Sequence, residues 1–279
     1  MHRNSSHQIE LFAAQANHEK IFSITKIIKG KVMNTLTKLI LIMITILLIG
    51  CSQSDQDIQQ NEINVSGSGN LVSREITLVE FDRVEAGMNF DLNIRQGTTP
   101  RVILTSDDNF IDFIQVEQVD NTIRFGFIPG YAYDTRGITL RAEVFMPELT
   151  GLDLEGSSHA NLDGYQSMGI LEARLTGASA LTGDVQVKSA ILNAYGSSFI
   201  HLTGSGTNLT LETCGANLVD LGAFAAEEAT IEISCNSRAN VDVSDQLQIK
   251  ASQYAQVIYD GNPTITAFDV SESASVRPK

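Results

Sequence analysis

One motif returns through the second half of the chain as LEGSSHANL (residues 154–162), LTGASAL (175–181), AYGSSFIHL (194–202) and TCGANLVDL (213–221). Three weaker copies follow as SCNSRANV (234–241), KASQYAQV (250–257) and DVSESASV (269–276). Aligned on the glycine of the first four, the equivalent positions are 156, 177, 196, 215, 235, 251 and 270, which lie 16 to 21 residues apart. A self-similar period near 19 residues predicts a solenoid with one coil per copy.

A second turn recurs inside the copies as Leu162-Asp163-Gly164, Leu181-Thr182-Gly183 and Leu202-Thr203-Gly204. Each unit therefore holds two or three short strands separated by Gly/Ser turns. Glycine suits such corners because it tolerates positive φ and close approach of another backbone. An antiparallel sandwich also has short strands and turns, but it would not keep the same tripeptide in a fixed register. We therefore expect an all-β solenoid, in which alternate Leu, Ile and Val side chains point inward and stack between coils.

The preceding part of the chain, residues 64–148, shows strand patterns without this repeat. Alternating or continuous apolar runs predict strands at Asn89–Ile94, Arg101–Leu104, Ile114–Val119, Thr122–Ile128 and Ile138–Phe145. Asp120-Asn121 is a plausible hairpin turn between two of these strands. No amphipathic helix is expected beyond a single turn at Asn109–Ile114. We expect residues 64–279 to form one domain, with longer strands at 64–148 and coils of about 19 residues at 149–279.

The N-terminal region reads as a targeting signal. Met33–Lys38 carries one positive charge, residues 39–49 are apolar apart from Thr45, and Leu48-Ile49-Gly50-Cys51 follows. A short apolar core before a small residue is typical of a secretion signal rather than a membrane-spanning helix. The small residue before Cys51 resembles the bacterial lipobox, in which the cysteine thiol is lipidated. An uncleaved anchor helix that happens to precede a cysteine is the alternative.

These features divide the N-terminal region into three parts. Residues 33–50 are the expected lipoprotein signal peptide, and residues 51–63 are an expected flexible tether because they are polar and without periodicity. Residues 1–32 are too long a polar lead for a normal signal, so we expect Met33 to be the start and 1–32 to be upstream sequence. Ser52 directly after the cysteine resembles outer-membrane sorting, which predicts a protein anchored at the outer membrane or the cell surface.

The charge of the chain excludes one class of partner. Residues 1–51 hold six of the 19 basic residues and two of the 33 acidic ones, so the rest carries a net charge of −18. Phosphate binding needs clustered Lys or Arg, and we therefore expect no nucleic-acid partner. The ordinary interpretation of this acidity is solubility in an exposed compartment.

Several motifs together resemble a known family. They are Ser66-Gly67-Ser68-Gly69-Asn70 with Arg74, Phe81-Asp82-Arg83-Val84, Asp91–Gly97, Ser106–Asn109, Met146-Pro147-Glu148-Leu149, the Gly-Ser-Ser repeats and Tyr259-Asp260-Gly261-Asn262-Pro263. This combination resembles the putative auto-transporter adhesin head, or GIN, domain, a family of unknown function common in Bacteroidota lipoproteins. The resemblance covers roughly residues 64–279 and implies a right-handed, single-stranded β-helix-like fold. The later coils depart from the pattern because Cys214, Cys235, Asn236 and Gln253 replace expected Gly or Ser.

Residues able to carry chemistry are few and scattered. His159 and His201, the only histidines after residue 51, lie at offsets +3 and +5 from their corner glycines, so they should not stack into a metal site. Asp163, Asp220 and Asp242 flank turns, but the regular Gly/Asp repeat of calcium-binding solenoids is missing. We expect no catalytic residue, cofactor or metal. Cys214 and Cys235 sit in adjacent coils, where stacked positions about 4.8 Å apart are compatible with a disulfide. They are one residue out of step, however, which would point their side chains to opposite faces and favours two free, largely buried thiols.

These observations favour a non-catalytic cell-envelope lipoprotein that presents a rigid β surface to a glycan or to an envelope or host protein. Two rows of small side chains after the corner glycines could line a flat hydrogen-bonding face, or could serve only the turns. They are Ser157, Ala178, Ser197, Ala216 and Asn236 in one row, and Ser158, Ser179, Ser198, Asn217 and Ser237 in the next. A polysaccharide-active enzyme on a β-helix, and a structural or signalling component of the envelope, are the alternatives.

Overall fold

The computed structural model describes residues 61–63, 66–166 and 169–279. They belong to one compact unit, Gln60–Lys279. The expected upstream region, the signal peptide and Cys51 lie outside the described residues. The described part is a β-solenoid of about seven turns, and its only helical element is the single 3-10 turn η1 (Ile111–Phe113). The predicted fold class is therefore confirmed. No helix among the described residues is long and apolar enough to cross a membrane.

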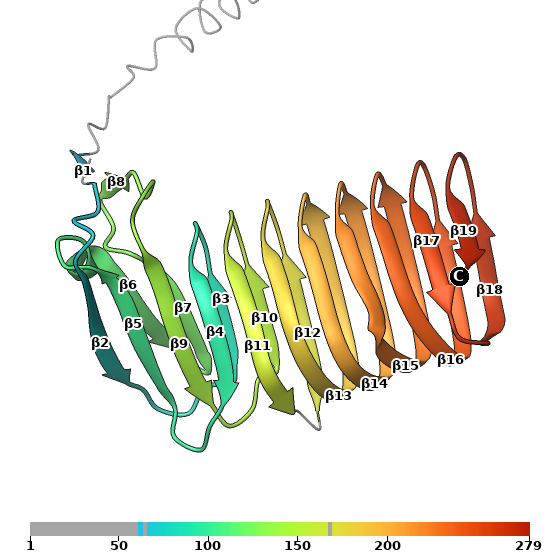
Figure 1. Cartoon of the computed structure of the whole chain (residues 1–279), viewed down its shortest axis with the longest axis horizontal. Coiled ribbons are helices and arrows are strands. Elements are labelled where there is room, and N and C mark those ends of the chain that lie inside the picture. The colour runs from blue at the N-terminus through green and yellow to red at the C-terminus, as the bar shows by residue number, and fades with distance from the viewer. Residues whose placement is uncertain (1–60, 64–65, 167–168) are drawn as a thin grey trace, which may run out of the picture. The chain divides into compact units, whose positions relative to one another are not determined.

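The coils form two parallel layers that face each other across the core (Figure 1), and their strands belong to one continuous sheet; each layer is called a sheet below. Their strands are β10 (Gly151–Leu154), β11 (His159–Gln166), β12 (Ile170–Leu175), β13 (Ala180–Gly196), β14 (Phe199–Gly215), β15 (Leu218–Cys235), β16 (Arg238–Ala251), β17 (Gln256–Asp260), β18 (Thr264–Val270) and β19 (Ser275–Pro278). In β13 to β16 one bent strand of 14 to 18 residues serves both sheets. The register is direct, since Ala180 lies beside Phe199 and Phe199 beside Leu218.

The first part of the domain closes one end of the solenoid. Its strands are β1 (Asn61–Ile63), β2 (Leu71–Thr77), β3 (Arg83–Ala86), β4 (Asp91–Gln96), β5 (Arg101–Asp107), β6 (Ile114–Val119), β7 (Thr122–Phe127), β8 (Tyr131–Tyr133) and β9 (Leu140–Met146). β3 and β4 continue the coils in parallel, whereas β2, β5 and β9 pair antiparallel, and β6 and β7 form the predicted hairpin. β1, which lies in the segment expected to be a tether, pairs with β8.

The core is built from inward rows of apolar side chains. One row runs through Ala160, Leu181, Ile200, Val219, Ala239 and Val257, which are partners in successive coils. Every member of this row is at most 4% exposed. Burying one Val, Leu or Ile side chain contributes about 1.5–3 kcal/mol, so these rows dominate the stability of the coils. A cluster of aromatic rings fills the closed end, comprising Phe90, Phe110, Phe113, Phe125, Phe127 and Tyr133.

At one of its corners, each coil turns through a residue with positive φ. These corner residues are Met88, Gly156, Gly177, Gly196, Gly215, Cys235, Gln253 and Glu272. Glycine is required at Gly177, because a Cβ there would lie 2.5 Å from the Gly156 carbonyl oxygen. The prediction that positions 251 and 270 are corners was wrong. Ala251 and Val270 are instead the last residues of β16 and β18, and the corners follow two residues later.

The two rows of small residues after the corners face opposite ways. Ser157, Ala178, Ser197, Ala216 and Asn236 are exposed, but Ser158, Ser179, Ser198, Asn217 and Ser237 are at most 2% exposed. The buried hydroxyls donate to main-chain carbonyls, as Ser179 Oγ does to Thr176 O at 2.7 Å. A short hydroxyl satisfies backbone groups that the turn leaves free. The second row is therefore turn chemistry, and only the first row is surface.

Candidate binding face

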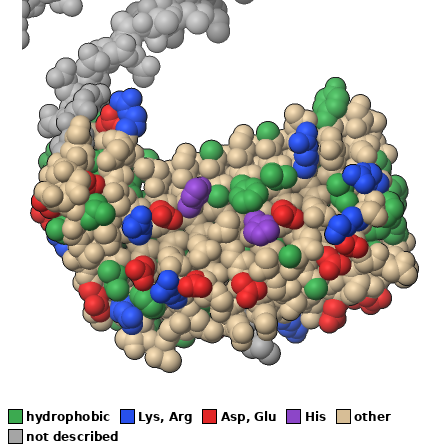
Figure 2. Space-filling model, in the orientation of Figure 1, with side chains coloured by type: hydrophobic (Ala, Val, Ile, Leu, Met, Phe, Trp, Pro, Cys, Tyr) green, Lys and Arg blue, Asp and Glu red, His purple; other side chains and the backbone are tan. Residues whose placement is uncertain are grey.

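One outer face of the solenoid carries both described histidines. We call it the histidine face and define it as the outward side of β4, β11, the first halves of β13 to β16, β17 and β19. Figure 2 shows the two histidines near its centre, with hydrophobic and acidic side chains beside them. Two rows cross this face from coil to coil. The first contains Asp91, His159, Ala180, Phe199, Leu218 and Arg238, and the second contains Asn93, Asn161, Thr182, His201, Asp220 and Asn240.

The second row contains a hydrogen-bonded cluster over three coils. His201 Nδ1 lies 3.1 Å from Asp220 Oδ2, and Asn240 Nδ2 donates to Asp220 Oδ1 at 3.1 Å. Burial raises the pKa of Asp220, but hydrogen bonds from the Gly222 amide, Asn240 and His201 outweigh it and leave the pKa below its ordinary value. Both His201 and Asp220 keep 42% of their side chains exposed. The bond at Nδ1 fixes the imidazole and leaves Nε2 available to a ligand.

An apolar patch lies directly beside this cluster. The rings of Phe199 and His201 are parallel within 4°, with centroids 6.4 Å apart. The two rings are neighbours because residues two apart in a strand, here β14, lie on the same face. Leu218 is the partner of Phe199 in the next coil and is 49% exposed. A flat ring, an exposed aliphatic side chain and a fixed polar cluster therefore meet at one place on a rigid sheet.

The remaining predicted residues do not converge on a single site. His159 lies in the row of Phe199, not in that of His201, as their different offsets indicated. Asp163 forms an ion pair with Arg95 at 3.1 Å, and Asp242 is the register partner of Asp260. The described ranges contain no group of three or more His, Cys, Asp or Glu that could hold a metal ion.

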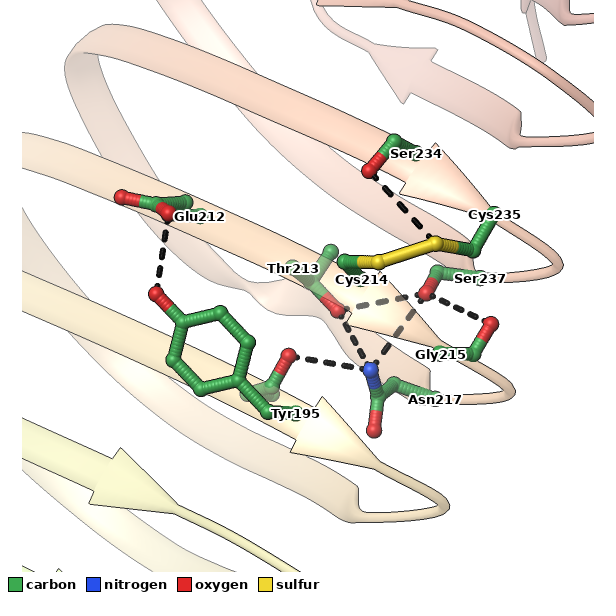
Figure 3. Close-up of a disulfide and its surroundings, with 10 residues drawn as sticks. Tyr195, Glu212, Thr213, Cys214, Gly215, Asn217, Ser234, Cys235 and Ser237 are labelled. Carbon is green, nitrogen blue, oxygen red and sulfur yellow. Dashed lines mark hydrogen bonds between the residues drawn. A yellow bond between two sulfur atoms is a disulfide. The ribbon is translucent and has the colours of Figure 1, made fainter. Parts of the chain in front are cut away.

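Cys214 and Cys235 form a disulfide between adjacent coils, with their Cα atoms 5.3 Å apart (Figure 3). The prediction of two free, largely buried thiols was therefore wrong, and both residues are only partly buried. The register itself was right, because Gly215 is the partner of Cys235. Alternation between faces holds only for extended backbone, and Cys235 has φ of +65°. The left-handed corner turns its Cβ toward Cys214.

A concave surface, separate from the histidine face, lies on the opposite sheet near the closed end. A hollow of about 440 Å³ is lined by Glu85, Ala86, Gly87, Arg124, Phe125, Asp153, Glu155 and Arg174. Arg124 Nε and Glu85 Oε2 form an ion pair at 2.6 Å, and the two side chains neutralise each other's charge in this hollow. Burial raises the pKa of Asp153. The charges are mixed in sign, so we regard this surface as secondary to the histidine face.

The fold and the exposed rows define a class of protein, a β-solenoid that offers a broad, regular surface for binding. Residues 80–263 match the family described as putative auto-transporter adhesin, head GIN domain. This chain belongs to that family, and the resemblance inferred from its motifs is confirmed. No curated protein matches the chain.

Three solved structures with this fold come from Bacteroides and Parabacteroides species. A putative adhesin from Bacteroides fragilis is 17% identical, covers 77% of this chain and 100% of its own, and has a TM-score of 0.69. A protein from Parabacteroides distasonis described as a putative lipid binding protein is 16% identical, with coverage of 77% and 99% and a TM-score of 0.62. A putative adhesin from Parabacteroides merdae is 17% identical, with coverage of 77% and 98% and a TM-score of 0.58. At these identities the similarity shows the fold alone.

Sequence reasoning missed the cluster around Asp220, although the signal was present. Asn161, Thr182, His201, Asp220 and Asn240 all lie five residues after a corner residue. Equal offsets in neighbouring coils place side chains in one row. Comparing offsets between different residue types, rather than between the two histidines only, would have predicted the contact between His201 and Asp220.

Proposed function

We propose that this chain is a non-catalytic binding module of the cell envelope, and that its histidine face holds an extended polar ligand. The observation that carries the proposal is the fixed His201–Asp220–Asn240 cluster beside Phe199 on an exposed, rigid sheet. Binding sites commonly combine apolar contact area with a few well-placed polar groups. Membership of a family described as adhesin heads supports the same conclusion.

A glycan is the ligand class that this surface favours. A sugar ring has an apolar face that could lie against Phe199 and Leu218, and hydroxyl groups that could bond to His201 Nε2 and Thr182. Neighbouring strands lie about 4.8 Å apart, so equivalent side chains repeat along the solenoid at a spacing close to the length of one sugar unit. A linear polysaccharide that runs across the strands would meet a similar row in each coil.

The anchor belongs to the same proposal. The short apolar core that ends in Leu48-Ile49-Gly50-Cys51 would give a lipidated Cys51, which holds the solenoid at the outer membrane or the cell surface. Residues 52–60 would then separate the membrane from the solenoid. We expect the module to contact its ligand without chemistry, because His201 and Asp220 form a single acid–base pair and no second carboxylate joins them in the described cluster.

The test is an array of bacterial and host glycans and matrix proteins, probed with residues 52–279. We expect binding to a glycan that falls at least tenfold in Phe199→Ala and in His201→Ala. Thr230→Ala, an exposed change on the opposite sheet, is the matched control and should bind normally. Binding that survives both histidine-face changes, or reproducible turnover of the bound glycan, would contradict the proposal.

A further inference from the structure

The end of the solenoid formed by β18 and β19 exposes side chains that every other coil buries. Ile265 is the register partner of Leu247, and Phe268 is the partner of Ile249. Leu247 and Ile249 are 0% and 2% exposed, whereas Ile265 and Phe268 are 41% and 54% exposed. Val270 and Val276, which continue the inward rows of Ala251 and Val257, are only partly buried. An apolar cross-section of the core therefore faces solvent.

The main chain at this end is also unpaired. Among the described residues β18 pairs only with β16, and β19 pairs only with β17, so each strand has one free edge. Charged residues and prolines usually protect an exposed edge from pairing. The β18 edge, Thr264–Val270, has no proline and only one charged residue, so it is weakly protected. At the other end of the domain β2, β5 and the aromatic cluster cover the core (Figure 1).

We propose that this open end binds the open end of a second copy of the same chain, forming a two-fold symmetric dimer. The two free edges belong to opposite sheets, so an occupant must offer two strand edges with apolar side chains between them. A single extended peptide could pair with only one edge. A second copy of the same coil offers both edges at the spacing of the two sheets, together with Ile265 and Phe268.

Charge supports a second copy in this position. The chain after Cys51 carries a net charge of −18, and most surfaces of two copies would repel each other. Residues 261–279 contain two acids, Asp269 and Glu272, and two bases, Arg277 and Lys279, so this coil has no net charge. Docking of two copies at the open end therefore brings together a part of each molecule that has no net charge.

The same charges select one arrangement of the two copies. Asp269 on β18 and Arg277 on β19 are exposed, and neither forms an ion pair with another described residue, although Asp269 is the register partner of Lys250, which pairs with Glu232. β18 and β19 run in opposite directions (Figure 1). A two-fold axis along the strands would pair β18 with β19 of the second copy, antiparallel, and bring Asp269 near Arg277 twice. The other two-fold arrangement would pair β18 with β18 and β19 with β19, and Asp269 would then have no Arg277 on the strand beside it.

Sedimentation velocity and light scattering on residues 52–279, which contain the whole compact unit, would test the dimer. We expect a mass twice that of the chain at high micromolar concentration, and the single-chain mass for Phe268→Lys. Ile170→Lys is the matched control, because Ile170 is 51% exposed on the outer side of β12, and it should remain dimeric. Cooperative thermal unfolding with the midpoint that wild type shows when diluted to the single-chain mass would show that Phe268→Lys is folded. A monomeric wild type, or a dimer that Phe268→Lys leaves intact, would overturn the proposal.

Charge reversal tests the arrangement separately. Arg277→Asp should weaken the dimer about tenfold, the change that 1.4 kcal/mol produces, and Asp269→Arg combined with Arg277→Asp should restore it. Restoration is expected only where Asp269 of one copy faces Arg277 of the other. If the single change has no effect, or the double change fails to restore the dimer, the pairing of β18 with β19 is wrong.

Discussion

Cys214 and Cys235 are joined between neighbouring coils although their positions differ by one residue in register. The link is possible because Cys235 occupies the left-handed corner where the coils before it have glycine. A left-handed φ is unfavourable for a residue larger than glycine, and the disulfide ties this corner to the adjacent coil. The disulfide closes a loop with a sequence separation of 21, which is slightly more than one coil.

Removing this disulfide should destabilise the domain by about 3 kcal/mol, the loop-entropy estimate for a cross-link that spans about 20 residues. The double change Cys214→Ser with Cys235→Ser, measured by urea unfolding, gives this difference without a reactive thiol. Wild-type protein treated with a reductant should show the same loss, and the double variant should not respond to the reductant. Equal unfolding midpoints of wild-type and double variant would count against a stabilising disulfide.

The buried amide of Asn217 is predicted to be the most sensitive polar group in the coils. It accepts a hydrogen bond from the Ser198 amide at 2.7 Å and donates to Ala194 O at 2.9 Å and to Thr213 Oγ1 at 2.8 Å. Asn217→Ala would leave these groups unsatisfied, at a cost of about 3 kcal/mol in the free energy of unfolding. Asn236→Ala, at an exposed position of the following corner, should lie within about 0.5 kcal/mol of wild type.

The assigned register predicts effects of very different size for two positions that lie two coils apart. Leu202 is fully buried, and Leu202→Asp would place an unpaired carboxylate in the core, so we expect a loss of several kcal/mol or no folded protein. Asn161 is exposed on the histidine face, and Asn161→Asp should change the stability by less than about 0.5 kcal/mol. Thermal unfolding of both variants decides the matter, because similar shifts for the two would mean that the inward and outward rows are misassigned.

Acid should weaken the closed end through Asp107. The carboxylate is 2% exposed and accepts hydrogen bonds from the Thr139 amide at 2.9 Å and the Gly69 amide at 2.8 Å. The bond from Thr139, and then that from Gly69, holds the pKa of Asp107 below its ordinary value. A lowered pKa in the folded state means that this stabilisation is complete above the unfolded-state pKa of about 3.9 and is lost as the pH falls below it.

The measurement is the unfolding midpoint as a function of pH. Asp107→Asn should be less stable than wild type at pH 7, since a neutral amide cannot accept both bonds, and its midpoint should fall less steeply in acid. Asp245→Asn, at an exposed position of β16, should keep the wild-type profile. An Asp107→Asn profile parallel to wild type throughout would show that Asp107 does not contribute to the acid response.

The strands and coils could be predicted because their signal is periodic. Alternation at Asn89–Ile94 and the recurrence of Gly156, Gly177 and Gly196 each report a repeating backbone geometry, and the structure follows both. Corners without glycine gave no such signal. Gln253 and Glu272 adopt positive φ at polar positions that resemble ordinary surface residues, so alignment by residue type placed those corners two residues too early.

Side-chain direction near the corners was the part that sequence could not supply. Alternation predicts which face a residue occupies only along an extended strand, and it fails where φ becomes positive. This failure accounts for the disulfide at Cys235 and for the burial of the row that includes Ser198. The candidate site on β14 and β15 lies just before the register shift that follows His201, so equal offsets from the corners place its rows correctly.

The predicted lipid anchor is testable independently of the fold. Residues 39–49 and the small residue before Cys51 predict that the Cys51 thiol is acylated and that the mature chain starts there. Each buried methylene contributes about 0.8 kcal/mol to membrane affinity, and one acyl chain alone holds a protein only reversibly, so stable anchoring requires more than one chain. Wild-type protein grown with labelled fatty acid should carry the label and sediment with membranes. Cys51→Ala should carry none and move to the soluble fraction, whereas Cys214→Ser, which leaves Cys51 intact, should remain labelled. Wild-type protein that takes up no fatty acid would show that Cys51 is not a lipidation site, and the module would then need another means of attachment.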